Sequence, residues 1–298
     1  MNQWQSYIDL LQAGDFKALA RCISLIENEA EGYEELLQLL PNKNTSVIGI
    51  TGPPGAGKST LVDGLISRMI TQNKKVAVLC VDPSSPFNLG ALLGDRIRMS
   101  EWYTNPNVYI RSLATRGSLG GLHPKIIEIT DLLKAAFFDY IIIETVGVGQ
   151  SEVEIAGLAD TTIVVVVPEA GDEIQTMKSG LMEIADMFVV NKADRPEADT
   201  FVKNLRLMLA PAFHKKTIPV PVIKTIASQK TGIDELLDAI TSHIQHATFN
   251  SKKSWLITEK AYQLIQKKRM NDVDKNELKD KIEQEGNNFN LYRFIKNY

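Results

Sequence analysis

The feature that most constrains the fold of this chain is a glycine-rich segment between an apolar run and a helical pattern. It reads G-P-P-G-A-G-K-S over residues 52–59, which matches G-x-x-x-x-G-K-[ST]. Residues 46–51 before it are apolar like a buried strand, and residues 58–71 after it carry apolar side chains at helical spacing. A strand, loop and helix in this order bring a nest of backbone N–H groups and the positive end of a helix to one point, where phosphate oxygens bind.

Each residue type in this loop has a physical role in binding a nucleoside triphosphate. The glycines let the backbone approach phosphate oxygens without an intervening side chain. We expect the Lys58 ammonium to bind the β- and γ-phosphates and the Ser59 hydroxyl to bind Mg²⁺. The loop residues expected to contact the nucleotide are Gly52, Pro53, Pro54, Gly55, Ala56, Gly57, Lys58, Ser59 and Thr60.

Short apolar runs alternate with helical patterns along most of the chain. Strands are predicted over residues 46–51, 76–82, 108–111, 139–145, 161–167, 187–190 and 222–226. Continuous apolar runs of this kind are typical of strands that are buried on both faces. The alternation predicts an α/β fold, a mostly parallel sheet flanked by helices as in P-loop NTPases, with ligands bound at the carboxyl ends of the strands.

Helical sequence flanks this alternating region at both ends. Residues 1–42 repeat apolar side chains at helical spacing and end at Pro-Asn. Residues 249–298 mix acidic and basic side chains in a helical pattern. We therefore expect an N-terminal helical extension over 1–42, a P-loop domain over 43–248, and a C-terminal helical region over 249–298 that is either a packed cap or an arm for self-association.

A second motif, N-K-A-D, follows another apolar strand at residues 191–194. An aspartate at this place can accept hydrogen bonds from N1–H and the amino group of guanine. Adenine offers neither donor, and a buried unpaired carboxylate would cost about 1–3 kcal/mol, so the motif predicts GTP or GDP as the ligand. The residues expected to hold the base are Asn191, Lys192 and Asp194, with the backbone at Ala227 and Ser228 facing the guanine carbonyl.

Carboxylates near other strand ends are candidates for magnesium binding and catalysis. The segment Glu144-Thr-Val-Gly147 stands where other GTPases have D-x-x-G, so Glu144 is expected to help hold Mg²⁺ and the Gly147 N–H to contact the γ-phosphate. Asp82 and Asp95 are interpreted as magnesium-shell or water-positioning groups, with loop capping as the structural alternative. Gln150 is a candidate to orient the attacking water, although it lies three residues after Gly147. Hydrolysis is expected to be slow unless a partner completes the site.

Composition narrows the class of protein further. The chain has 298 residues, of which 44% are apolar and 23% charged, and its net charge is −3. These values are typical of a soluble globular protein and give no reason to expect nucleic acid or a membrane as a partner. Two separate cysteines and four scattered histidines indicate no zinc site and a reducing compartment. Without a leader-like N-terminus or an apolar run of roughly 20 residues, the protein is expected to be cytoplasmic.

Taken together, the motifs resemble the MeaB/ArgK/MMAA family of P-loop GTPases, in the SIMIBI class. The resemblance covers roughly residues 40–235, and the segment E-T-V-G-V-G-Q-S-E is its most specific part. The matching segments are residues 51–60, 81–85, 93–99, 144–152, 168–180 and 191–194.

The resemblance implies a GTPase chaperone for an adenosylcobalamin-dependent acyl-CoA mutase, with methylmalonyl-CoA mutase as the first choice. It implies a role in cofactor loading, protection or reactivation of the mutase, and a homodimer formed through C-terminal helices. Gln175 and Lys178 match a switch loop that relays the nucleotide state to the mutase. The chain departs from the family at Glu169, where a small residue is expected, and its C-terminal region is shorter than usual.

Other classes of protein fit parts of the sequence. A metal-insertion GTPase of the hydrogenase or urease maturation type shares the fold class but uses Cys/His clusters that this sequence lacks. A signal-recognition GTPase would need a methionine-rich domain. A kinase would need an acceptor site and gives no reason for Asn191 and Asp194. A pure binding module does not explain a full set of phosphate and magnesium residues.

Overall fold

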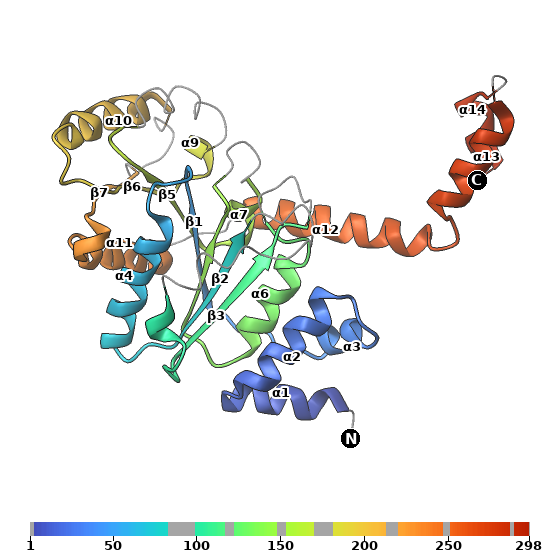
Figure 1. Ribbon diagram of the computed structural model, residues 1–298, viewed down its shortest axis with the longest axis horizontal. Helices are drawn as coiled ribbons and strands as arrows, with labels where there is room; N and C mark the ends of the chain where they lie inside the picture. The colour runs from blue at the N-terminus through green and yellow to red at the C-terminus, as the bar shows by residue number, and fades with distance from the viewer. Residues whose placement is uncertain are drawn as a thin grey trace. The chain divides into compact units, whose positions relative to one another are not determined.

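The chain divides into two compact units, one ending at Lys253 and one beginning at Ser254. The computed structural model describes residues 3–82, 99–116, 122–147, 153–169, 181–212, 220–246, 251–286 and 289–297. Within these ranges the first unit contains a seven-stranded parallel sheet in the order β3-β2-β4-β1-β5-β6-β7 (Figure 1). The strands are β1 (Ser46–Thr51), β2 (Val76–Asp82), β3 (Val108–Ala114), β4 (Tyr140–Glu144), β5 (Thr161–Val166), β6 (Met187–Val190) and β7 (Val222–Lys224).

Helices follow the strands in alternation. Those of the first unit are α1 (Gln3–Ala13), α2 (Phe16–Glu27), α3 (Tyr33–Gln38), α4 (Lys58–Thr71), η1 (Ser100–Trp102), α6 (Ile126–Ala135), α7 (Val153–Leu158), α9 (Leu181–Ile184), α10 (Ala198–Ala212), η2 (Ala227–Gln229) and α11 (Ile233–His246). Helix α12 (Ser251–Arg269) begins just before the boundary, and α13 (Lys275–Glu285), α14 (Leu291–Phe294) and η4 (Ile295–Asn297) follow it.

The predicted α/β fold with a mostly parallel sheet is confirmed. Strand β4 is one residue shorter than predicted at each end and β5 one residue shorter at its end, and the bounds differ more at β3 and β7. Strand β3 continues three residues beyond the predicted end, because its last residues pair with β2 as far as Asp82. Strand β7 ends two residues early, because Ile226 forms an isolated antiparallel bridge with Thr231 and the chain turns there.

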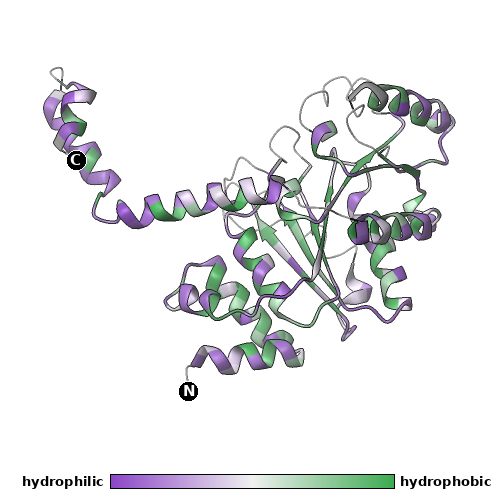
Figure 2. Ribbon diagram, turned by 180° about the vertical axis from the view of Figure 1, so that it is seen from behind, coloured by the Kyte–Doolittle hydropathy of each residue, from purple (hydrophilic) through white to green (hydrophobic). Residues whose placement is uncertain are grey.

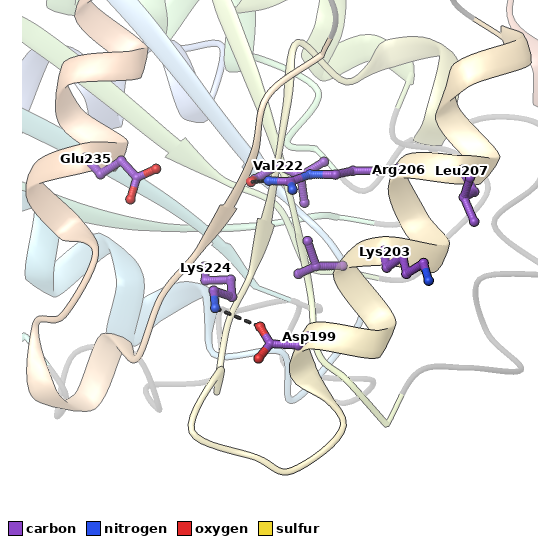
Figure 3. Close-up of a pocket in the computed structure, with 8 residues that line it drawn as sticks. Asp199, Lys203, Arg206, Leu207, Val222, Lys224 and Glu235 are labelled. Atoms are coloured by element: carbon purple, nitrogen blue, oxygen red, sulfur yellow. Dashed lines mark hydrogen bonds and ion pairs between the residues drawn. The ribbon is translucent and has the colours of Figure 1, made fainter.

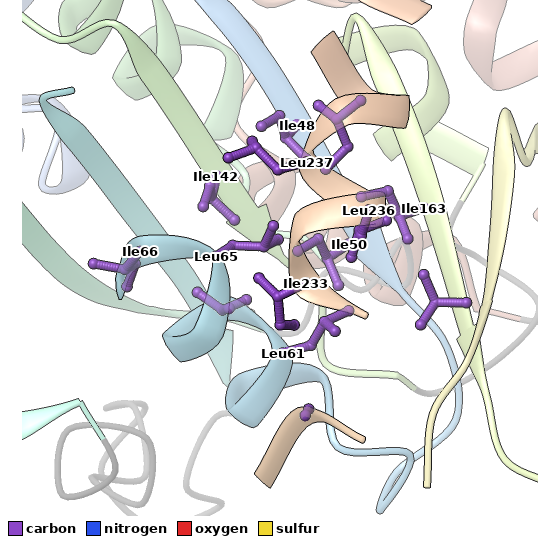
Figure 4. Close-up of a cluster of buried hydrophobic side chains, with 14 of the residues drawn as sticks. Ile48, Ile50, Leu61, Leu65, Ile66, Ile142, Ile163, Ile233, Leu236 and Leu237 are labelled. Atoms are coloured by element: carbon purple, nitrogen blue, oxygen red, sulfur yellow. The ribbon is translucent and has the colours of Figure 1, made fainter. Parts of the chain in front are cut away.

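The core on one face of the sheet is formed by α4 and α11. Their aliphatic side chains interdigitate with those of the central strands, and Ile48, Leu65, Ile142 and Leu236 have no exposed surface (Figure 4). Burial of one such side chain stabilises the fold by about 1.5–3 kcal/mol. This core therefore fixes the start of α4 relative to the end of β1, which is where the glycine-rich loop lies.

The opposite face of the sheet is covered in part by α6 and α7. At Gly49 in β1, an added Cβ would collide with Ile155 of α7, so the absence of a side chain permits the helix to approach the strand. Coloured by hydropathy, the strands are largely hydrophobic and the helices carry polar outer surfaces (Figure 2). The central strands are thus buried on both faces, as continuous apolar runs predict.

The N-terminal helices α1 and α2 pack beside α6 (Figure 1). Asp15 caps α2 by accepting hydrogen bonds from the backbone N–H groups of Lys17 and Ala18. The ring of Phe16 in its first turn packs against Tyr109 of β3, with 5.4 Å between the ring centroids. These helices are therefore joined to the β3 edge of the sheet by apolar contact.

The second unit consists of helices with many exposed apolar side chains. Asp274 caps α13, and Phe289 packs against Phe294 with ring centroids 5.6 Å apart. Trp255, Tyr262 and Tyr292 are more than half exposed. In the described part of the chain, no helix combines the length and apolar character needed to cross a bilayer.

Candidate nucleotide site

The glycine-rich loop packs closely against neighbouring segments. Gly52, Gly55 and Gly57 have φ values of 137°, 76° and 88°, in the region that side chains disfavour. An added Cβ at Gly52 would collide with the carbonyl oxygen of Val165, and one at Gly57 would collide with the side-chain amide of Asn191. Two of these glycines are thus required by close packing as well as by backbone conformation.

Lys58 is buried at the start of α4, with its side chain folded over the loop. Its Nζ donates hydrogen bonds to the carbonyl oxygens of Gly52, at 2.8 Å, and Pro53, at 3.2 Å. Gly147, with φ of 87°, lies directly beside it, because an added Cβ there would collide with Nζ. The structure therefore brings together the lysine and the glycine that were predicted separately to contact terminal phosphates.

Three predicted magnesium residues lie at the carboxyl ends of adjacent strands or at the start of α4. The Ser59 hydroxyl donates to Oε1 of Glu144, at 2.8 Å, and both side chains are buried. Asp82 is also buried, at the end of β2, the neighbour of β4. In the described residues no group of three or more His, Cys, Asp or Glu side chains is placed to hold a metal. The predicted magnesium residues that the structure describes are two carboxylates and one hydroxyl, and the fourth, Asp95, lies outside the described residues.

Asn191 connects three loops at the carboxyl edge of the sheet. Its Nδ2 donates to the Ala56 carbonyl at 2.9 Å, and its Oδ1 accepts from the Thr225 hydroxyl and from the Ala227 N–H, both at 3.1 Å. Sequence reasoning assigned this residue to the base and missed its role as a bridge. The available signal was the residue type. An amide both donates and accepts hydrogen bonds, whereas an ionised aspartate at this position would only accept them.

The base-reading residues predicted from two distant segments also meet. The N–H of Ala193 donates to the Thr225 carbonyl at 3.0 Å, which joins the N-K-A-D turn to the turn that contains Ala227 and Ser228. Lys192 has a φ of 56°, which turns the chain sharply after Asn191. Asp194 and Ser228 are exposed, so they are open to a ligand at this edge.

The remaining predicted site residues divide into two groups. Pro53 and Thr60 are half-buried and Pro54 and Gly55 exposed, all in or beside the loop. Asp95, Gln150, Gln175 and Lys178 lie outside the described residues. The individual roles of all these residues stay predictions. For the residues that the structure describes, the shared location at one edge of the sheet is observed.

A separate pocket of about 440 Å³ lies beside the edge strand β7 (Figure 3). Its described lining comes from α10, β7 and α11, not from the glycine-rich loop. Asp199 and Lys224 pair across it at 2.8 Å, and the hydrogen bond from Lys224 lowers the pKa of Asp199. Arg206 donates to the Val222 carbonyl, on the strand edge that β6 does not cover. Because no residue of the glycine-rich loop lines it, this pocket is not the candidate nucleotide site.

Comparison with known proteins also indicates a GTPase. A family model described as methylmalonyl Co-A mutase-associated GTPase MeaB matches residues 19–283. A Pyrococcus abyssi protein named as a GTPase is 49% identical over 241 residues, which cover 79% of this chain and 74% of that protein. The fused isobutyryl-CoA mutase of Geobacillus kaustophilus is 36% identical over 269 residues, covering 84% of this chain but 25% of that protein.

A solved structure agrees with these matches. The crystal structure of a LAO/AO transport system kinase superposes with a TM-score of 0.67 at 29% identity, over 92% of this chain and 86% of that one. With the family match extending over most of the chain, the resemblance seen in the motifs is confirmed, and a guanine nucleotide is the ligand that the family implies. The chain belongs to the MeaB family of GTPases.

Proposed function

We propose that this chain binds and hydrolyses GTP as a chaperone of an adenosylcobalamin-dependent acyl-CoA mutase, assisting cofactor loading, protection or reactivation. The observation that carries the proposal is the match of 84% of this chain to one quarter of a fused isobutyryl-CoA mutase. The presence of a segment similar to this chain within a polypeptide named as a mutase supports the proposal that the two act together. No comparable observation favours the alternative, metal insertion of the hydrogenase or urease type.

The proposed binding mode follows from the positions of charge and N–H groups. Lys58 neutralises phosphate charge from the position where it now bonds loop carbonyls, and the loop N–H groups and the N-terminus of α4 bind phosphate oxygens. Asp194 accepts hydrogen bonds from the guanine edge. Asn191 bonds both the glycine-rich loop, at Ala56, and the turn at Ala227, and so fixes these two parts of the site relative to each other.

The residues present fit a magnesium ion. Hydroxyl and carboxylate oxygens are the ligands that Mg²⁺ prefers, and it binds through few protein groups plus the substrate phosphates. Ser59 and Glu144 already contact each other, with Asp82 on the next strand and Asp95 proposed to join them. When bound, the ion would neutralise charge that develops on the phosphates. With Asp82, Asp95 and Gln150 proposed to position water, we expect slow hydrolysis that a partner accelerates.

The proposed homodimer is supported by the second unit. Nine large apolar side chains among the described residues of this unit are exposed, and apolar surface of this extent on a small helical unit marks an interaction site. They are Trp255, Ile257, Tyr262, Leu264, Ile265, Met270, Leu291, Tyr292 and Ile295. Gln175 and Lys178 are proposed to relay the nucleotide state to the mutase.

The test is GTP hydrolysis by the pure chain, with and without methylmalonyl-CoA mutase loaded with adenosylcobalamin. We expect the mutase to raise the rate by about tenfold or more. Lys58→Ala should abolish the rate in both conditions. Slow hydrolysis that no mutase changes would contradict the chaperone role and leave the GTPase assignment intact.

A further inference from the structure

The turn between α2 and α3 contacts the chain on both sides of the connection between β3 and α6. We call residues 27–33 the α2–α3 corner. Glu27 at its start pairs with Arg111 within β3 and with Arg116 just beyond its end. Glu29 pairs with Lys125, the residue before α6. Two acidic residues, Glu27 at the end of α2 and Glu29 in the turn that follows, thus hold both flanks of one connection at the carboxyl edge of the sheet.

Glu27 makes the closest set of these contacts. Its Oε2 accepts from Arg111 Nη2 at 2.8 Å, its Oε1 from Arg116 Nη2 at 3.3 Å, and its backbone carbonyl from Arg116 Nη1 at 2.7 Å. The Glu27 side chain is only 14% exposed. The Arg116 side chain is itself 36% exposed, but its guanidinium is held at two points, by the side chain and by the backbone carbonyl of Glu27, and these charge-assisted hydrogen bonds fix its position.

Lys125 holds the other flank. Its Nζ lies 3.1 Å from Glu29 Oε1 and 4.8 Å from the centroid of the Tyr33 ring, and its side chain is 8% exposed. Burial alone would lower the pKa of Lys125, but the hydrogen bond with Glu29 and the charge of Glu128 outweigh it and raise the pKa. The lysine is therefore a fixed cation that ties α6 to the corner.

The held end of β3 is bonded directly to a candidate magnesium residue. The N–H of Thr115, the neighbour of Arg116, donates to the backbone carbonyl of Asp82 at 3.0 Å. In the strand register, Ala114 lies opposite Asp82. The chain of contacts thus runs from Glu27 through Arg116 and Thr115 to the end of β2.

We infer that Glu27 is a positioning residue of the GTPase site, which sets the place of Asp82 through Arg116 and Thr115. The N-terminal helices are then a part of the nucleotide machinery and not only a cover for the β3 edge. The inference rests on the proposed function in one respect, the assignment of Asp82 to the magnesium shell.

The test compares Glu27→Gln with the wild-type chain, in full length. GTP hydrolysis is measured as a function of Mg²⁺ concentration, and GDP binding is measured in EDTA. Since loss of an outer-shell partner weakens metal sites about 10–100-fold, and this partner acts through the backbone, we expect about a tenfold rise in half-saturating Mg²⁺. GDP affinity in EDTA should stay within about twofold, because no base or phosphate contact is touched.

Glu35→Gln is the matched control, because Glu35 accepts a hydrogen bond from Trp4 within the same helices. It should leave the Mg²⁺ dependence unchanged, and an equal shift in both variants would reduce Glu27 to a stability role and overturn the inference. A folded Glu27→Gln with wild-type Mg²⁺ dependence would also overturn it. If Glu27→Gln does not fold, Arg116→Gln, at a more exposed position, carries the same expectation. A wild-type rate indifferent to Mg²⁺ would contradict the magnesium assignment itself.

Discussion

The phosphate-loop region and the second unit use apolar and polar groups in opposite ways. Around the loop, Ile48 and Leu65 have no exposed surface, and polar groups such as Ser59 and Glu144 bond one another. In the second unit, Trp255 and Tyr292 are 60% and 76% exposed. In the described residues of the first region, apolar side chains pack against one another and polar side chains bond within the chain. The second presents apolar surface that another protein surface can cover.

This difference indicates which region suits a small ligand and which suits a protein partner. A site for a small anion requires fixed donors, which only a packed core can supply. A surface for a protein partner requires apolar side chains that are exposed in the free chain and become buried in the complex. The same substitution is therefore expected to have different consequences in the two regions.

The largest contrast is expected for isoleucine. Ile240 in α11 is fully buried, whereas Ile265 in α12 is 50% exposed. Ile240→Ala should lower the free energy of unfolding by about 2–5 kcal/mol, because it leaves a cavity in the core. Ile265→Ala should lower it by less than about 0.5 kcal/mol. Urea unfolding of both variants measures this.

Ile265→Ala should act instead on association. If the second unit forms the homodimer, this variant should shift the mass in analytical ultracentrifugation toward the monomer at micromolar concentration. A monomeric wild-type chain, or a dimer that is indifferent to Ile265, would break the comparison. The second unit would then need another explanation for its exposed apolar side chains.

A smaller contrast is expected for asparagine. Asn191→Ala removes three hydrogen bonds between loops and should cost about 2–3 kcal/mol of stability, together with most of the GDP affinity. Asn276→Ala, on the exposed first turn of α13, should change neither. Thermal unfolding and GDP titration distinguish the outcomes. An Asn191 variant with full affinity would show that the bridge is dispensable.

Asp194 tests whether an exposed group in the first unit can still be decisive. Its side chain is exposed, yet the proposed guanine contact predicts a loss of roughly tenfold to hundredfold in GTP affinity for Asp194→Asn. Affinity for xanthosine triphosphate should rise. Xanthine has a carbonyl acceptor where guanine has an amino donor, and the substitution replaces a carboxylate acceptor with an amide donor. Stability should not change. An unaltered preference for GTP would remove Asp194 from the base site.

The smallest effect concerns pH. The pKa of Lys125 is raised above 10.5, so its charge favours the folded state. That contribution is fully present below about pH 10.5 and is lost as the pH rises through the higher folded pKa. Lys125→Met should therefore reduce the fall in stability above this pH by less than about 1 kcal/mol. Urea unfolding at pH 9 and pH 11 would show it, and identical pH profiles would contradict it.

The sequence was sufficient for features that local pattern determines. The bounds of β1, β2, β6 and α4 coincide with the predicted ones, since apolar runs and the glycine-rich loop mark their ends. The fold class and the edge where the site lies follow from the alternation of strands and helices. These are properties of short segments read in order.

Features that depend on distant pairs could not be predicted in the same way. Asn191 bonds Ala56 across 135 residues, and Arg116 bonds Glu27 across 89. Nothing near Glu27 in the sequence marks it as more than a charge at the end of an amphipathic helix. Long-range contacts of this kind appear only when the register of the strands and the packing of the helices are known.

The strand order has a consequence for how the chain is made. Strand β1 lies at the centre of the sheet, between β4 and β5, and its partners follow it by about a hundred residues. At synthesis rates of roughly 5–20 residues per second, β1 waits about 5–20 s on the ribosome before either partner emerges. During that time an apolar strand and the loop that follows it are exposed. The segment proposed to bind the nucleotide is thus made well before the strands that enclose it.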